Sequence, residues 1–161
     1  MAAMPPPGRR TLIWALVPAA LCAVLLAAAD PRGAFPLNDD FQWSDAVFGF
    51  VAGRGLRFAE WVYASAVTHV AFGAVPARLF GPTDEVLRVW NMAWGCVAAG
   101  LVVLLGRRFE AGRGAALAAG CALAAPPLHL VMSASFHLEI TLMLALLLAF
   151  WAFLSYEESG A

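Results

Sequence analysis

Charged residues are scarce in this sequence of 161 residues, and lysine is absent from it. Only 13% of the residues are charged and 62% are hydrophobic, with a mean hydropathy of +0.77. Soluble domains carry about 25% charged residues, so this composition indicates an integral membrane protein. Ten arginines against eleven acids leave a net charge of −1. Without a basic surface, we expect no nucleic-acid partner.

Motifs of common soluble enzymes are also missing. The three cysteines, Cys22, Cys96 and Cys121, lie inside apolar runs without metal-ligand spacing, so we interpret them as packing residues. His69 and His129 stand alone in apolar runs, and we expect hydrogen-bonded packing residues there too. There is no Gly-rich phosphate loop after a strand, and no Ser, His and Asp set with catalytic spacing. The clustered acids are what remains to explain.

Long uncharged runs dominate the chain. Four of them predict transmembrane helices, at about 11–29, 89–106, 115–136 and 140–156. The first run follows two arginines and ends in three alanines, which is also the pattern of a cleavable signal peptide. It is longer than the core of a typical signal peptide, so we favour an uncleaved span. The predicted fold class is all-α, a polytopic membrane protein with about four transmembrane helices.

A fifth apolar run, 61–77, is long enough to span but contains polar residues and a proline. If it does not span and the N-terminus is cytoplasmic, the arginine-rich turn at 106–114 is also cytoplasmic, as the positive-inside rule requires. We therefore predict that 61–77 lies at the outer interface. Residues 30–88 then form an outer loop with seven of the eleven acids. The domain boundaries are a cytoplasmic tail at 1–10, a transmembrane module at 11–156 and a cytoplasmic end at 157–161.

The outer loop contains "NDDFQWSDAVFGFVAGRG" at 38–55, which predicts a helix. Asn38 can cap it, Asp39 and Asp40 fit its first turn, and the glycines near 55 can end it. Its aromatic residues indicate an amphipathic helix on the membrane surface. Capping and dipole effects, each about 1 kcal/mol or less, explain one acid better than two. Adjacent carboxylates are costly to charge together, which suits a general base.

A second candidate site lies in the turn between the third and fourth predicted spans, which contains His137 and Glu139. An ionisable group at a membrane boundary is a functional-site hypothesis by default. The alternative is an interfacial turn whose polar groups are simply hydrated. His-x-Glu supplies two metal ligands without a third, so the sequence leaves the question of a metal open.

Several pieces of the chain follow one another in a recognisable order: "PLNDDFQWSDAVFGFVAGRGLRFAEW", "ARLFG", "LRVWN", "GRRF" and a hairpin with an acid at its outer tip. This order, over roughly 9–156, resembles the N-terminal part of the GT-C superfamily of membrane glycosyltransferases. The most similar group is the family-39-like set of dolichyl-phosphate-mannose protein mannosyltransferases and aminoarabinose transferases. The resemblance implies transfer of a sugar from a polyprenyl-phosphate donor to an acceptor on the outer face.

The resemblance also implies site residues. In that family, an acidic pair begins the surface helix, and its leading Asp is thought to act as catalytic base or to position the acceptor; here the pair is Asp39 and Asp40. A second acid, usually Asp, lies at the outer start of the fourth span, where this chain has the longer Glu139. With His137 it forms a candidate substrate-binding pair.

The leaving phosphate needs its charge offset as the bond to the sugar breaks. Arg54 and Arg57 follow the predicted surface helix and are candidates for this substrate-binding role. A divalent metal is the other candidate, and no cofactor is certain from the sequence.

Members of the family are several hundred residues long, so we expect this chain to equal the first third or so of such an enzyme and to be inactive alone. Its partners would be the lipid-linked donor, the bilayer, and a missing C-terminal portion or partner membrane subunit. We expect a multi-pass protein of the bacterial inner membrane with a cytoplasmic N-terminus. The alternative function is a small non-enzymatic subunit that packs on a larger membrane partner through its alanine- and glycine-rich spans.

Overall fold

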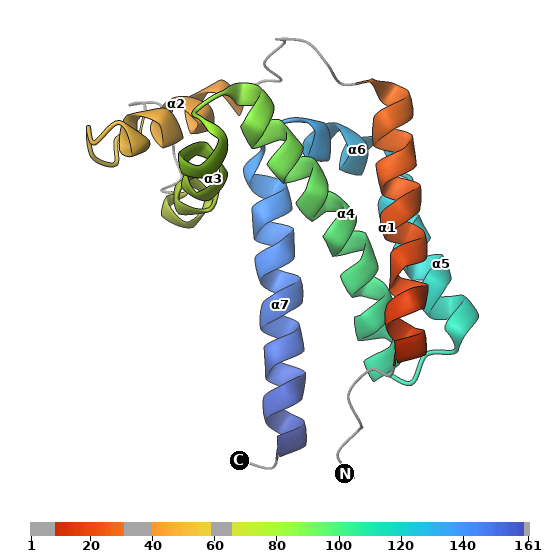
Figure 1. Ribbon diagram of the computed structural model, residues 1–161. Helices are drawn as coiled ribbons and strands as arrows, with labels where there is room; N and C mark the ends of the chain where they lie inside the picture. The colour runs from red at the N-terminus through yellow and green to blue at the C-terminus, as the bar shows by residue number, and fades with distance from the viewer. Residues whose placement is uncertain (1–8, 31–39, 59–65, 160–161) are drawn as a thin grey trace.

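The computed structural model describes residues 9–30, 40–58 and 66–159, and in these residues every regular element is an α-helix. Three long helices run along the molecule (Figure 1): α1 at Arg9–Ala29, α4 at Asp84–Arg108 and α7 at Leu138–Ser159. Each is long and apolar enough to cross a membrane. The predicted all-α, polytopic fold class is confirmed.

The third predicted span is not one straight helix. Its range is covered by α5 at Arg113–Ala124 and α6 at Pro127–Ala134, which are bent by 59° at a short break. Pro126 and Pro127 are adjacent at this break. A proline lacks the backbone donor that a helix needs and disfavours helix in the residue before it, so a continuous helix over 115–136 does not form. The described residues thus hold three candidate spans, or four if the bent pair counts as one.

Small residues bring the long helices close together. A Cβ added to Gly100 in α4 would lie 2.9 Å from the backbone oxygen of Ala15 in α1. A Cβ on Gly120 in α5 would lie 2.7 Å from Val103 Cγ2 in α4. Helices α1, α4 and α5 therefore pack in direct contact, as small residues permit in membrane proteins. Helix α7 packs against α4 instead.

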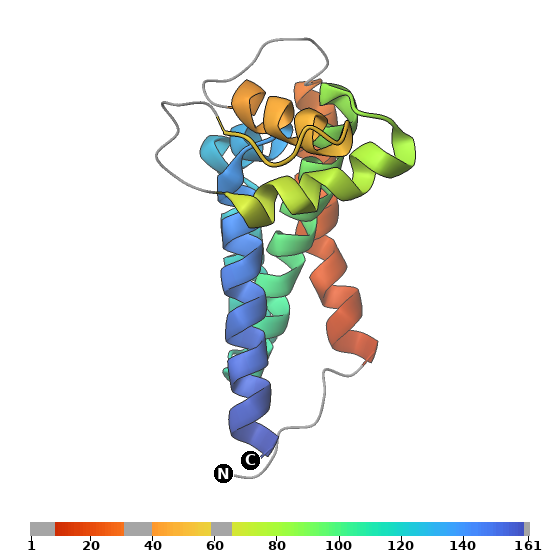
Figure 2. The ribbon, with the colours of Figure 1, turned by 90° about the vertical axis from the view of Figure 1, so that its left-hand side faces the viewer.

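Two shorter helices, α2 at Asp40–Val51 and α3 at Val67–Phe80, form a surface layer. They lie across the end of the molecule where α1 ends and where α4 and α7 begin (Figures 1 and 2). With 14 residues, α3 is about 21 Å long, which is less than the roughly 30 Å hydrocarbon core. The surface layer contributes Trp43, Val47 and Val70 to a buried cluster. In this cluster they pack with Leu87 of α4 and with Phe136.

Candidate functional site

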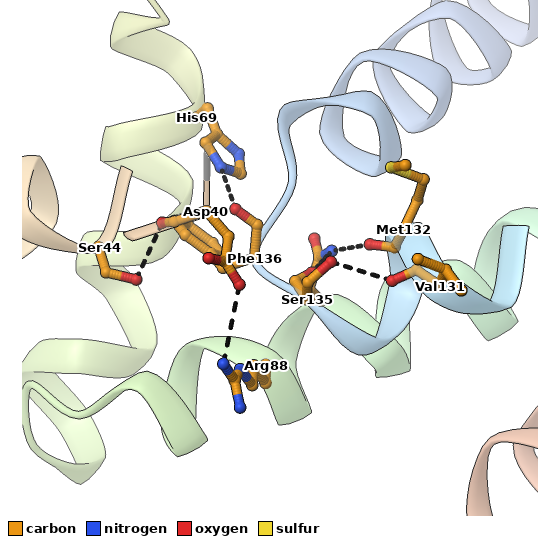
Figure 3. Close-up of polar contacts among 9 residues, drawn as sticks. Asp40, Ser44, His69, Arg88, Val131, Met132, Ser135 and Phe136 are labelled. Atoms are coloured by element: carbon orange, nitrogen blue, oxygen red, sulfur yellow. Dashed lines mark hydrogen bonds and ion pairs between the residues drawn. The ribbon is translucent and has the colours of Figure 1, made fainter. Parts of the chain in front are cut away.

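Asp40, the first residue of α2, points toward α4 and meets Arg88 (Figure 3). The distance from Asp40 Oδ2 to Arg88 Nη2 is 3.8 Å, and the side chains are only 4% and 14% exposed. Ser44 Oγ donates to the backbone oxygen of Asp40 at 3.2 Å, which ties the first turn of α2 together. Asn38 and Asp39, the predicted cap and leading acid, lie outside the described residues. A buried carboxylate is thus held against a guanidinium where the surface layer meets a spanning helix.

Asn91, one turn after Arg88 on α4, binds the end of α6. Its Nδ2 donates to the backbone oxygens of Met132 at 3.0 Å and Ser135 at 2.6 Å. The last carbonyls of a helix have no partner within the helix, so Asn91 supplies donors that α6 would otherwise lack. Arg88 and Asn91 are three residues apart and therefore share a face of α4. This face connects the start of α2 with the break before α7.

His69 of α3 is fully buried, in the packing role predicted for it. Its Nδ1 lies 2.8 Å from Thr141 Oγ1 and its Nε2 lies 3.4 Å from the backbone oxygen of Phe136. Its ring stacks on that of Phe136 with a centroid distance of 4.1 Å, and Trp43 meets it edge-on at 5.8 Å. Burial lowers the pKa of His69 to about 4, against a smaller opposing effect of the Phe136 carbonyl. His69 is therefore neutral near pH 7 and joins α2, α3 and α7.

His129 fits its prediction only in part. It is buried on α6, but its Nε2 has no hydrogen-bond partner among the described residues.

His137 and Glu139 lie together just before and within the first turn of α7. His137 Nδ1 is 3.3 Å from Glu139 Oε2, with the histidine side chain 7% exposed and the glutamate 63% exposed. Glu139 also borders a shallow, open hollow of about 510 Å³ that is lined by residues of α7 alone. Its other lining residues are Leu142, Met143, Leu146, Leu147 and Phe150. An exposed carboxylate thus lies at one end of an apolar face of α7.

Arg54 and Arg57 line a different hollow, of about 400 Å³, beside α2. Gln42 and Asp45 line it as well, whereas Asp40, Arg88 and Glu139 do not. The predicted site residues that the structure describes therefore lie in three separate places. Asp40 lies beside Arg88, His137 lies beside Glu139, and Arg54 and Arg57 line a hollow with Asp45. In the described part of the chain, no three His, Cys, Asp or Glu side chains gather as a metal site.

Arg88 and Asn91 were not among the predicted site residues. The available signal was their position, because both are polar residues within or beside an otherwise apolar predicted span. Their partners, however, come from α2 and α6, which no local pattern connects to α4.

A sequence model described as dolichyl-phosphate-mannose-protein mannosyltransferase matches residues 65–161, which is more than half of the chain. The matched range contains Arg88, His137 and Glu139 but begins after Asp39 and Asp40. No curated protein and no solved structure matches the chain. With a multi-pass helical fold and a match of this extent, the chain belongs to the dolichyl-phosphate-mannose-protein mannosyltransferase family.

Proposed function

We propose that this chain acts in a glycosyltransferase reaction that moves a sugar from a polyprenyl-phosphate donor to an acceptor. The reaction would take place on the outer face of the bacterial inner membrane, at the end of the molecule that carries α2 and α3. The family description names dolichyl-phosphate-mannose, so a lipid-linked mannose is the first donor to test.

The buried Asp40 and Arg88 pair is the observation that carries this proposal. Burying two charges costs several kcal/mol per ion before their attraction is counted, so such a pair is weak support for stability alone. Ionisable groups at the ends of spanning segments favour a functional role. In the proposed orientation the pair would lie at the level of the lipid headgroups, where a phosphate could meet the protein while the lipid tail stays in the bilayer.

Asp39 is the catalytic base in this proposal, because the carboxylate of Asp40 already faces Arg88. The base takes the proton of an acceptor hydroxyl as its oxygen attacks the anomeric carbon, and the bond from that carbon to the phosphate oxygen breaks. Polyprenyl phosphate is the leaving group. Asp40 and Arg88 hold the described start of α2 against α4.

Glu139 and His137 bind the donor or acceptor at the edge of the site. The face of α7 that runs from Glu139 is apolar, and we propose that the polyprenyl tail lies along it. Arg54 and Arg57 line another hollow, and the proposed step does not need them at the reacting phosphate.

Three substitutions separate a catalytic base from a helix cap. In native host membranes that carry the variant chain, Asp39→Asn should lower the rate of sugar transfer by roughly 10² to 10⁴-fold, the usual contribution of a positioned base. Asn38→Ala should cost about 1 kcal/mol of stability with little change in rate. Asp40→Asn should lie between them. Transfer is measured with a radiolabelled polyprenyl-phosphate sugar and stability by thermal unfolding; normal transfer by Asp39→Asn would remove the base from the mechanism.

A further inference from the structure

A polar hollow beside α2 is separate from the Asp40 and Arg88 pair and has no role in the proposed transfer. It has a volume of about 400 Å³ and lies between α2 and the segment that follows it. Gln42, Asp45 and Gly49 contribute one wall. Residues three to four apart lie on the same side of a helix, so this wall is a continuous face of α2.

The opposite wall is formed by a tight turn. Gly53 and Gly55 have φ values of 76° and 79°, a conformation that glycine adopts without strain. Between them, the backbone N–H of Arg54 donates to the backbone oxygen of Gly49 at 2.9 Å. A Cβ added to Gly49 would lie 3.7 Å from Arg54 Nη2, so the guanidinium lies directly over this glycine. The Gly-Arg-Gly turn therefore sets the position of the arginine over α2.

Several polar groups of the hollow have no partner in the described part of the chain. Asp45, Arg54 and Arg57 are exposed, and none has an ion-pair partner among the described residues. Gln42 is only 6% exposed, yet its Oε1 accepts no hydrogen bond from a described residue. A buried carbonyl left without a donor costs about 1 to 3 kcal/mol. Because this oxygen is covered from solvent, a ligand in the hollow would meet the exposed Asp45, Arg54 and Arg57 instead.

We propose that the polar hollow binds a phosphate ester that also carries hydroxyl groups, such as a glycerophosphate or a sugar phosphate. Two guanidinium groups match the oxygens of one phosphate. The exposed carboxylate of Asp45 is an acceptor, so it needs a hydroxyl donor on the ligand. Phe41 and Phe58 complete the lining and cover the carbon skeleton of the ligand. This proposal does not depend on the proposed sugar transfer.

The phosphate ester has two sources, a soluble molecule or a phospholipid headgroup, and the test has one arm for each. In the first arm, the full chain in detergent is titrated with glycerol 1-phosphate by calorimetry, with phosphocholine as the matched compound that has no hydroxyl or N–H donor. In the second, native mass spectrometry counts lipids retained from nanodiscs of phosphatidylglycerol or of phosphatidylcholine. Saturable binding in either arm, about ten-fold weaker for the choline compound, supports the proposal and identifies the source.

Substitutions of the lining residues test whether the ligand binds in the hollow. Arg57→Gln and Asp45→Asn should each weaken it about ten-fold, the effect of losing one charged hydrogen bond. Arg113→Gln is the matched control, because Arg113 is also an exposed arginine in a Gly-Arg-Gly segment but begins α5, near the opposite end of α4.

Gly49 provides an independent pair of variants. Gly49→Ala places its methyl group at an ordinary contact distance and should bind normally, whereas Gly49→Leu fills the hollow and should abolish binding. Circular dichroism checks that each variant folds. The proposal is wrong if neither arm shows saturable binding, if phosphocholine binds equally well, or if Arg57→Gln and Asp45→Asn behave like Arg113→Gln.

Discussion

At the scale of single residues, the neutral ring of His69 makes the hydrogen bonds that link α3 to α7. Its Nε2 faces the Phe136 carbonyl, which only accepts, so this nitrogen carries the proton. Nδ1 then accepts from the hydroxyl of Thr141. A second proton on the ring would place a charge in the fully buried cluster and break the bond from Thr141.

Stability should therefore depend on pH through His69. Its pKa is about 4 in the folded chain against 6.5 for the unperturbed side chain, so the unfolded chain takes up the proton first as the pH falls. The stabilisation is complete above about pH 6.5 and is lost progressively down to about pH 4, by roughly 3 kcal/mol. Thermal unfolding across this range should show the loss in the native chain and a smaller loss in His69→Gln. Equal pH dependence in both proteins would contradict this assignment.

The candidate site was harder to predict than this histidine. The acids at 39 and 40 stand out in the sequence because they are adjacent at the start of a predicted helix. Arg88 does not, because its partner Asp40 is far away along the chain and only the folding of α2 onto α4 brings them together. Likewise, no sequence pattern shows that Arg54 and Asp45 share a hollow, since that depends on how the turn at Gly53 directs the chain.

At the scale of helices, the close approach of α1 and α4 depends on the absence of one side chain. Gly100→Ala would force its methyl group to within 2.9 Å of the Ala15 carbonyl, and a backbone atom cannot move aside as a flexible side chain does. Gly114→Ala is the matched control in α5, because nothing lies within 4 Å of the added Cβ.

We expect Gly100→Ala to destabilise the chain by about 1 to 3 kcal/mol, the usual cost of overpacking. Gly114→Ala should be neutral or slightly stabilising, since alanine favours helix by about 1 kcal/mol over glycine. Thermal unfolding in detergent compares the two. A Gly100→Ala variant as stable as Gly114→Ala would show that α1 and α4 do not pack as described.

Helix type and order were predictable from the apolar runs, and helix continuity was not. The ranges of α1, α4 and α7 agree with three predicted spans to within five residues at either end. The break at Pro126 was missed because the residues from 115 to 136 stay hydrophobic across it. Proline, however, lacks the backbone N–H that a continuous helix needs. Helix α3 begins at Val67, inside the run 61–77 whose first residues lie outside those described.

At the scale of the whole molecule, the arginines that end α4 and the proposed site lie at opposite ends. Helix α4 begins at the surface layer, where Asp40 lies, and ends with Arg107 and Arg108 at the end where α1 starts (Figure 1). The positive-inside rule would place that arginine end in the cytoplasm and the surface layer outside.

Thiol labelling tests this orientation. In a chain that lacks the three native cysteines, single cysteines at Asp45 and Asp84 should react with an impermeant reagent from outside, and one at Glu110 should not. All three native residues are exposed, so a missing signal reflects the side of the membrane. Opposite labelling at 45 and 84 would mean that the segment containing α3 crosses the bilayer.

The contribution of Phe136 and Thr141 to the His69 cluster has a consequence for biosynthesis. Helices α1, α4 and α5 contact one another and can assemble in the bilayer while the ribosome is still translating the rest of the chain. The Phe136 ring and the Thr141 hydroxyl that contact His69 of α3 emerge only afterwards, with the start of α7. A nascent chain arrested before residue 136 would therefore hold surface helices that can contact α4 but lack Phe136 and Thr141, and the His69 cluster would be the last part of that end to form.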